Sequence, residues 1–164
     1  MKTLFIGGIK SGKSSLAETY ILQNSISKPI YLATTEFIDE EMKLRISSHK
    51  KRRKKNFITI EESLHLSKIT AYQNSPILVE CISMWINNML YHDRSDDAIF
   101  EELHKVCTMP NDIVFVLNDV GQSVVSDNPL VRRFVDLSGI ASQIIAQHCD
   151  AVFDVKAGIS IQIN

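Results

Sequence analysis

Residues 7–14 read Gly-Gly-Ile-Lys-Ser-Gly-Lys-Ser, and their types and spacing suit phosphate chemistry. They follow the apolar run Thr3–Ile6 and precede a helix-like stretch, Ser14–Gln23. The pattern G-x-x-x-x-G-K-[ST] between a strand and a helix surrounds the phosphates of a nucleoside triphosphate with backbone N–H groups. We expect Lys13 to reach the outer phosphates and the Ser14 hydroxyl to bind Mg²⁺; the alternative is a plain glycine turn. The expected nucleotide contacts here are Gly7, Gly8, Ile9, Lys10, Ser11, Gly12, Lys13 and Ser14.

A carboxylate, Glu80, interrupts the apolar run Ile77–Cys81. A charge in such a run is costly unless it binds something. P-loop enzymes use an acidic residue at the end of a neighbouring strand to hold Mg²⁺, so Glu80 is a candidate metal ligand beside Ser14. The alternative is a glutamate that simply reaches solvent. Asp119, just after the run Ile113–Leu117, is a second candidate, and the sequence does not separate the two.

A histidine lies within a basic segment that is expected to be helical, Asp39–Lys55. Residues three and four apart share one face of a helix. Nearby cations oppose protonation of His49, so its neutral imidazole would be nucleophilic, while guanidinium groups would bind phosphate oxygens. Such a group could attack a nucleotide phosphorus. The residues on this face are Arg45, His49, Arg52 and Arg53.

The same basic segment has two other interpretations: a solvated face, or a nucleic-acid-binding patch formed by Lys50–Lys55. The chain has no second basic cluster and no aromatic residues interleaved with this one, as single-stranded nucleic-acid sites have. We therefore expect no nucleic-acid partner.

Apolar runs alternate with helix-like segments along the chain, which predicts an α/β fold. We expect a P-loop NTPase-like three-layer domain: a mainly parallel sheet, helices on both faces and a C-terminal hairpin with Gly158 in its turn. The expected strands are Thr3–Ile6, Ile30–Ala33, Ile77–Cys81, Ile113–Leu117, Ala151–Val155 and, more weakly, Phe57–Ile60. The expected helices are Ser14–Gln23, Asp39–Lys55, Glu62–Tyr72, Ile82–Tyr91, Asp97–Cys107 and Leu130–Cys149.

Length and composition favour one catalytic domain over residues 1–164. The chain is 45% hydrophobic with a formal net charge of −1, enough apolar material for a core and no charge signal for a partner. It lacks an apolar run long enough to span a membrane, and its first residues lead directly into a strand, so we expect no targeting segment. Three separated cysteines, Cys81, Cys107 and Cys149, lie largely among apolar residues. We expect reduced, buried thiols and a cytoplasmic location.

The order of these motifs resembles that of the bifunctional adenosylcobinamide kinase / adenosylcobinamide-phosphate guanylyltransferase family of cobalamin biosynthesis. The similarity extends over nearly the whole chain, and the segment around His49 occurs together with a block from Asn118 to Gln143, which unrelated P-loop proteins would not share. The matching pieces are residues 7–14, 31–35, 39–42, 45–46, 49–50, 59–61, 78–82, 118–121 and selected positions from 125 to 143.

The resemblance implies two reactions: phosphorylation of adenosylcobinamide by ATP or GTP, then transfer of GMP from GTP through a guanylylated His49. It implies Mg²⁺, a corrinoid substrate, a homotrimer and further nucleotide contacts. One departure is Asp119, where relatives usually carry glutamate; the stretch between His92 and Asn111 is also shorter. A P-loop kinase without guanylyltransferase activity, or an NTP-dependent nucleic-acid-binding module, remains an alternative. The implied contacts outside the loop are Ala33, Thr34, Thr35, Lys50, Lys51, Arg52, Arg53, Glu61 and Glu80.

Overall fold

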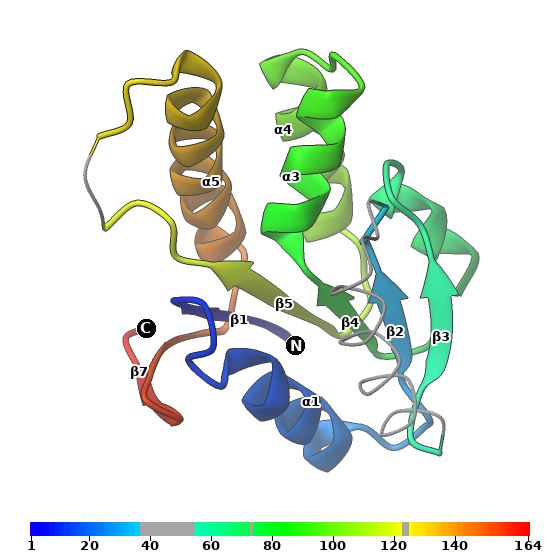
Figure 1. The fold of residues 1–164 in the computed structure, drawn as a ribbon. Helices are drawn as coiled ribbons and strands as arrows, with labels where there is room; N and C mark the ends of the chain where they lie inside the picture. The colour runs from blue at the N-terminus through cyan, green and yellow to red at the C-terminus, as the bar shows by residue number, and fades with distance from the viewer. Residues whose placement is uncertain (37–54, 73, 123–124) are drawn as a thin grey trace.

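The computed structural model describes residues 1–36, 55–72, 74–122 and 125–164 (Figure 1). The expected helix Asp39–Lys55, apart from Lys55 itself, therefore lies outside the described residues, as do His49, Lys50, Lys51, Arg52 and Arg53.

One sheet organises the described part of the chain, with strand order β3-β2-β4-β5-β1-β6-β7. All neighbouring strands are parallel except β6 and β7, which are antiparallel. The expected mainly parallel sheet is confirmed. The strands are β1 (Lys2–Gly7), β2 (Ile30–Ala33), β3 (Ile58–Glu61), β4 (Ile77–Glu80), β5 (Ile113–Asn118), β6 (Ala151–Lys156) and β7 (Ile159–Gln162). The helices are α1 (Lys13–Asn24), α3 (Ile82–Tyr91), α4 (Asp96–Cys107), α5 (Pro129–Gln147) and a 3₁₀ helix, η1 (Leu66–Tyr72).

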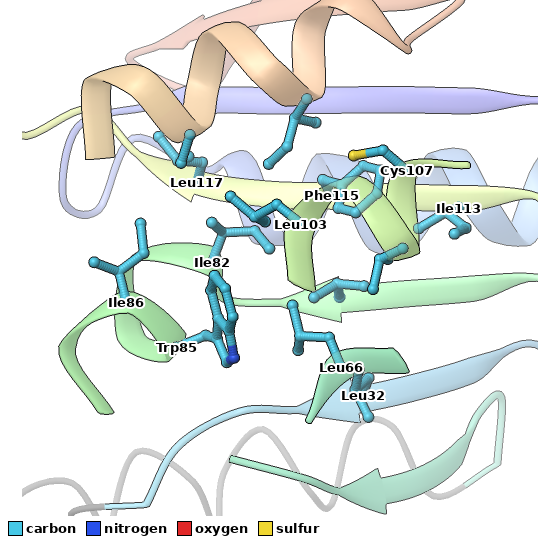
Figure 2. Close-up of a cluster of buried hydrophobic side chains, with 14 of the residues drawn as sticks. Leu32, Leu66, Ile82, Trp85, Ile86, Leu103, Cys107, Ile113, Phe115 and Leu117 are labelled. Atoms are coloured by element: carbon cyan, nitrogen blue, oxygen red, sulfur yellow. The ribbon is translucent and has the colours of Figure 1, made fainter. Parts of the chain in front are cut away.

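Helices cover both faces of the sheet, which confirms the three-layer arrangement (Figure 1). On one face, Ala17 and Ile21 of α1 pack in a cluster with strand residues such as Val114. On the other face, α3, α4 and α5 form a larger core in which Trp85 and Phe115 are fully buried (Figure 2). Because both faces are covered, the central strands are apolar without alternation.

Side-chain caps start two of these helices. The Ser95 hydroxyl accepts the Ala98 N–H at 3.2 Å and starts α4. The Asn128 side chain accepts the Leu130 N–H at 2.9 Å, with Pro129 at the first turn of α5. Serine and asparagine are favoured as N-cap residues, and proline is favoured at the first helical position.

The prediction of a helix over Glu62–Tyr72 is wrong for its first residues and for its type, since only η1 forms there. The Glu62 Oε1 accepts the N–H groups of Leu64 and His65 at 3.0 and 2.9 Å. The Ser67 N–H donates to the Glu102 carboxylate at 2.7 Å. Carboxylates thus bind these backbone donors in a local turn that competes with an α-helix.

The expected C-terminal hairpin is confirmed in β6 and β7. The two residues that join the strands, Ala157 and Gly158, have φ angles of 53° and 79°. Positive φ at both positions matches the turn whose twist suits two-residue hairpins. The hairpin extends the sheet beyond β1, beside the segment that leads into α1 (Figure 1).

Candidate active site

The glycine-rich loop connects β1 to α1 at the carboxyl edge of the sheet, as the sequence predicts. Two of its residues have positive φ, Lys10 at 58° and Gly12 at 98°. The Ser11 N–H donates to the Gly8 carbonyl at 3.2 Å, which closes a tight turn. The loop therefore has the strand–turn–helix setting that phosphate binding requires.

The first turn of α1 receives no side-chain cap: the residue at its N-cap is Gly12, which has no side chain to supply one. The backbone N–H groups at a helix start have no partner within the helix and bind anions well. Helices α4 and α5 use side chains at this position, whereas α1 and α3 do not. In α1 the uncapped first turn directly follows the glycine-rich loop, which suits a phosphate site.

Lys13 begins α1 and is almost fully buried, at 6% exposure. Its Nζ donates to the Gly8 carbonyl at 3.1 Å, so the side chain arches back over the loop. An ammonium in this place lies where the β- and γ-phosphates bind in P-loop proteins.

The structure brings together the two predicted metal ligands, Ser14 and Glu80. The Ser14 hydroxyl donates to the Glu80 Oε1 at 2.7 Å, across 66 residues of sequence. A hydroxyl and a carboxylate beside a phosphate site supply the oxygen ligands that Mg²⁺ prefers. The residues present thus fit the ion.

Asp119, the rival candidate, is bound within its own loop. Its carboxylate accepts the Gly121 N–H at 3.3 Å and also the side-chain amide of Gln122. Its backbone N–H donates to the Gly7 carbonyl at 2.9 Å, which anchors the loop after β5 to the start of the phosphate loop.

Three of the residues implied as nucleotide contacts form a row at the carboxyl ends of neighbouring strands. Ala33 of β2 pairs with Glu61 of β3 on one side and with Glu80 of β4 on the other. In open parallel sheets, ligands bind beyond this edge. The row therefore borders the expected nucleotide site.

Thr34, also implied as a contact, is fully buried and bound to the end of β4. Its Oγ1 accepts a hydrogen bond from the Cys81 N–H at 2.8 Å. The same hydroxyl donates to the Cys81 carbonyl at 2.9 Å. Its backbone N–H donates to the Glu80 carbonyl at 3.0 Å. The hydroxyl thus holds the main chain on which the Glu80 carboxylate is carried.

Asn88 extends this arrangement and was not anticipated from the sequence. It is fully buried in α3, and its amide nitrogen donates to the carbonyls of Thr34 at 2.6 Å and Ser63 at 3.1 Å. An amide in a strongly apolar helix was the available signal, because buried polar groups are nearly always hydrogen-bonded.

The hairpin turn supports the phosphate loop, a second role that the sequence analysis missed. The Gly158 N–H donates to the Ser11 carbonyl at 2.8 Å. A Cβ on Gly12 would lie 3.2 Å from the Gly158 Cα, and a Cβ on Gly7 would lie 2.4 Å from the Val155 carbonyl oxygen. Close backbone approach explains these glycines of the motif.

A polar contact between Glu36 and His92 lies at the last described position before residue 37. The Glu36 carboxylate and the His92 Nε2 are 2.8 Å apart, and His92 caps the C-terminal end of α3. Glu36, the last described residue before residue 37, is therefore attached to α3, the helix that follows Glu80.

The three thiols are free, two of them buried and Cys149 half-buried. In the parts of the chain that the structure describes, no cluster of three or more His, Cys, Asp or Glu side chains is placed to hold a metal ion. The described helices also include none that is long and apolar enough to cross a membrane.

An uncapped helix start, an inward-facing lysine and a serine–carboxylate pair on a mainly parallel sheet define a P-loop protein that binds nucleoside triphosphates. Within that class, residues 3–163 match the family model described as cobinamide kinase / cobinamide phosphate guanyltransferase, and the chain belongs to this family. The resemblance noted from motif order is confirmed.

Curated relatives support the same membership. The chain is 34% identical to the bifunctional adenosylcobalamin biosynthesis protein CobP of Pseudomonas aeruginosa, covering 100% of this chain and 98% of the relative. It is 30% and 32% identical to the bifunctional adenosylcobalamin biosynthesis proteins CobU of Escherichia coli and Salmonella typhimurium, with full coverage of both chains in each case.

Solved structures show the fold alone. An ATPase of a bacterial type III secretion system has a TM-score of 0.57 at 12% identity, covering 98% of this chain and 56% of that chain. The flagellar accessory protein FlaH from Methanocaldococcus jannaschii has a TM-score of 0.50 at 15% identity, covering 99% of this chain and 77% of that chain.

Proposed function

We propose that this protein, acting as one catalytic unit over residues 1–164, phosphorylates the side-chain hydroxyl of adenosylcobinamide and then guanylylates the resulting phosphate. The observation that carries the proposal is the 2.7 Å contact between Ser14 and Glu80 beside the phosphate loop, in a chain that belongs to the cobinamide kinase / guanyltransferase family. ATP or GTP supplies the phosphoryl group, and GTP supplies GMP.

In the kinase step, the corrinoid hydroxyl oxygen attacks the γ-phosphorus, its proton passes to water, and the bond from the γ-phosphorus to the bridging β-phosphate oxygen breaks. Lys13 and the N–H groups of the loop and of α1 stabilise charge on the transferring and leaving groups. Mg²⁺, held by Ser14 and Glu80, would neutralise charge on the phosphate oxygens. Positioning and charge neutralisation supply most of the rate in phosphoryl transfer.

In the guanylyl step, an imidazole nitrogen of His49 attacks the α-phosphorus of GTP and pyrophosphate leaves. The phosphate of the corrinoid then attacks the same phosphorus, the P–N bond breaks and the imidazole is restored. A covalent intermediate divides a difficult displacement into two easier ones. The phosphate loop that binds a γ-phosphate can also bind the leaving pyrophosphate. Arg52, Arg53, Lys50 and Lys51 are proposed phosphate contacts.

GTP labelled at the α-phosphate tests the histidine. With Mg²⁺, we expect acid-labile, base-stable label on the wild-type protein and on His65→Ala, and none on His49→Ala. Equal labelling of both alanine variants would refute the role of His49. Phosphorylation of cobinamide without any labelled protein would favour a kinase alone. Salt-sensitive binding to RNA or DNA through Lys50–Lys55 would favour a nucleic-acid-binding module.

We further propose a cytoplasmic homotrimer, on the basis of family membership and of the nucleoside triphosphates that the reactions consume. Sedimentation equilibrium measures the assembly directly: a molar mass near three times that of the chain is expected, and a monomer at micromolar concentration would contradict it.

A further inference from the structure

Two adjoining cavities lie on the α3–α5 face of the sheet, at the edge that carries the phosphate loop. The larger, about 390 Å³, lies between α3 and α5, which pack against each other (Figure 1). The smaller, about 330 Å³, lies between α5 and the loop that follows β5. Val131 and Phe134 line both cavities, so the two adjoin at these side chains, and together we call them the recess.

The lining of this recess is mostly apolar with a polar border. Tyr91 and Leu130 remain largely exposed beside the larger cavity, and Val125 beside the smaller one. Asn87 and Asp136 add hydrogen-bonding groups. An apolar hollow with a few polar groups is typical of small-molecule sites. Apolar side chains gathered on a surface also commonly mark a binding site.

The recess is also at a suitable distance from the phosphate site. The loop that borders it starts at Asp119, whose N–H donates to the Gly7 carbonyl at 2.9 Å. Leu90 lies near the end of α3, eight residues beyond Ile82, which follows Glu80 by two residues. At 1.5 Å per residue that is roughly 12 Å along the helix. A ligand that reaches from the Leu90 end of the larger cavity to Glu80 would therefore span a distance of this order.

We propose that this recess binds the corrin ring of the acceptor, with the apolar ring edge against Val131 and Phe134 and the hydroxyl-bearing arm directed towards Lys13. The proposal rests on the proposed function and deepens it by placing the acceptor. A corrin ring is broad and apolar at its methylated edge, and its peripheral amides suit Asn87 and Asp136. A cavity on the opposite sheet face, beside Tyr20 and Phe153, has only about 180 Å³.

Two matched variants on α5 test the placement. Val131 and Ile140 are β-branched and exposed to 42% and 43%, but only Val131 lines the recess. We expect Val131→Gln to raise the KM for cobinamide at least about tenfold, since polar substitution removes apolar burial. Ile140→Gln should leave this KM unchanged, and both variants should keep wild-type labelling by α-labelled GTP, which needs no corrinoid.

Equilibrium dialysis of cobinamide, followed by its visible absorbance, separates the remaining outcomes. Equal KM and equal cobinamide binding in the two variants would overturn the placement. Unchanged binding with a loss of the oligomer in Val131→Gln would also overturn it, because a second copy would then occupy this face. If the wild-type protein binds cobinamide without phosphorylating it, the proposed function fails while weakened binding in Val131→Gln still supports the recess. Absence of binding to the wild-type protein overturns both.

Discussion

The Ser14 hydroxyl and the Glu80 carboxylate meet at 2.7 Å, although Ser14 lies in the first turn of α1 and Glu80 ends β4. Strand β5 separates these two strands in the sheet, so the contact depends on the register of three parallel strands. At the same edge of the sheet, the Asp119 carboxylate accepts hydrogen bonds from the Gly121 N–H and the Gln122 amide. The geometry thus favours Glu80 over Asp119 as the Mg²⁺ ligand, which stays a prediction.

Glu80→Gln keeps the side-chain length and an oxygen acceptor for Ser14 but removes the charge. We expect the half-saturating Mg²⁺ concentration for cobinamide phosphorylation to rise at least about tenfold, because carboxylate charge dominates binding of this ion. Mg²⁺ titration of the kinase rate measures the effect. Asp119→Asn is the matched control and should shift the titration by less than about threefold. A reversed order of the two variants would transfer the metal role to Asp119.

Thr34→Val removes a buried hydroxyl at nearly constant volume and leaves the Cys81 N–H without its acceptor. We expect a loss of about 1–3 kcal/mol in the free energy of unfolding, measured with urea. Thr34→Ser retains the hydroxyl and should lose less. The Mg²⁺ titration of Thr34→Val should also shift towards that of Glu80→Gln, with recovery in Thr34→Ser. Identical titrations for both Thr34 variants would limit the residue to a stabilising role.

The adjacent glycines Gly7 and Gly8 differ in the room that each leaves for a Cβ atom. A Cβ at Gly7 would meet the Val155 carbonyl, whereas a Cβ at Gly8 would meet nothing within 4 Å. We expect Gly7→Ala to lower the free energy of unfolding by about 1–3 kcal/mol, as overpacking does. Gly8→Ala should stay within about 0.5 kcal/mol of wild type, as open surface positions do. Similar urea midpoints for the two variants would contradict the close contact with β6.

Stability should fall at alkaline pH because of two thiols. Burial raises the pKa of Cys107 to about 11, and burial together with nearby Cys107 and Asp150 raises the pKa of Cys149 to about 12. In the unfolded chain a cysteine thiol has its ordinary pKa of about 8.5. Above that pH only the unfolded chain releases these protons, so the stabilisation is complete below it and is lost as pH rises towards 11.

Thermal unfolding between pH 7.5 and 10.5 measures this loss. The Cys107→Ala/Cys149→Ala variant should have a lower melting temperature at every pH, because alanine leaves cavities at both positions. Its melting temperature should fall less steeply with pH than that of wild type. Parallel slopes would show that other groups cause the alkaline loss. Slow alkylation of both thiols in the native protein at pH 7.5 is also expected, since the thiolate is the reactive form.

Local patterns predicted those features that depend on neighbours in sequence. The Gly7–Ser14 motif, the unalternating strands and the turn at Gly158 each follow from residues within a few positions. The first residues of the Glu62–Tyr72 segment were misjudged because the backbone donors of Leu64 and Ser67 bind the carboxylates of Glu62 and Glu102 instead of helical carbonyls. Period and propensity do not record such competition.

Long-range polar contacts account for most of what the sequence did not predict at the site. The hydroxyl of Thr34 binds a peptide group 47 residues away, and Asn88 reaches its carbonyl across 54. In both contacts the partner is a backbone group, so no sequence motif marks either contact. The nucleophilic role of His49 remains a prediction, because residues 37–54 lie outside the described structure.

The contact between Gly158 and Ser11 joins two segments that are synthesised far apart in time. On the ribosome, residues 7–14 emerge before residues 151–162, which form the hairpin that supports them. Strand β6 is also the neighbour of β1 on one side in the sheet. A nascent chain that stops before β6 therefore carries the whole phosphate motif without its support. Such a chain would gain the support for nucleotide binding only once β6 and β7 are made, after α3, α4 and α5.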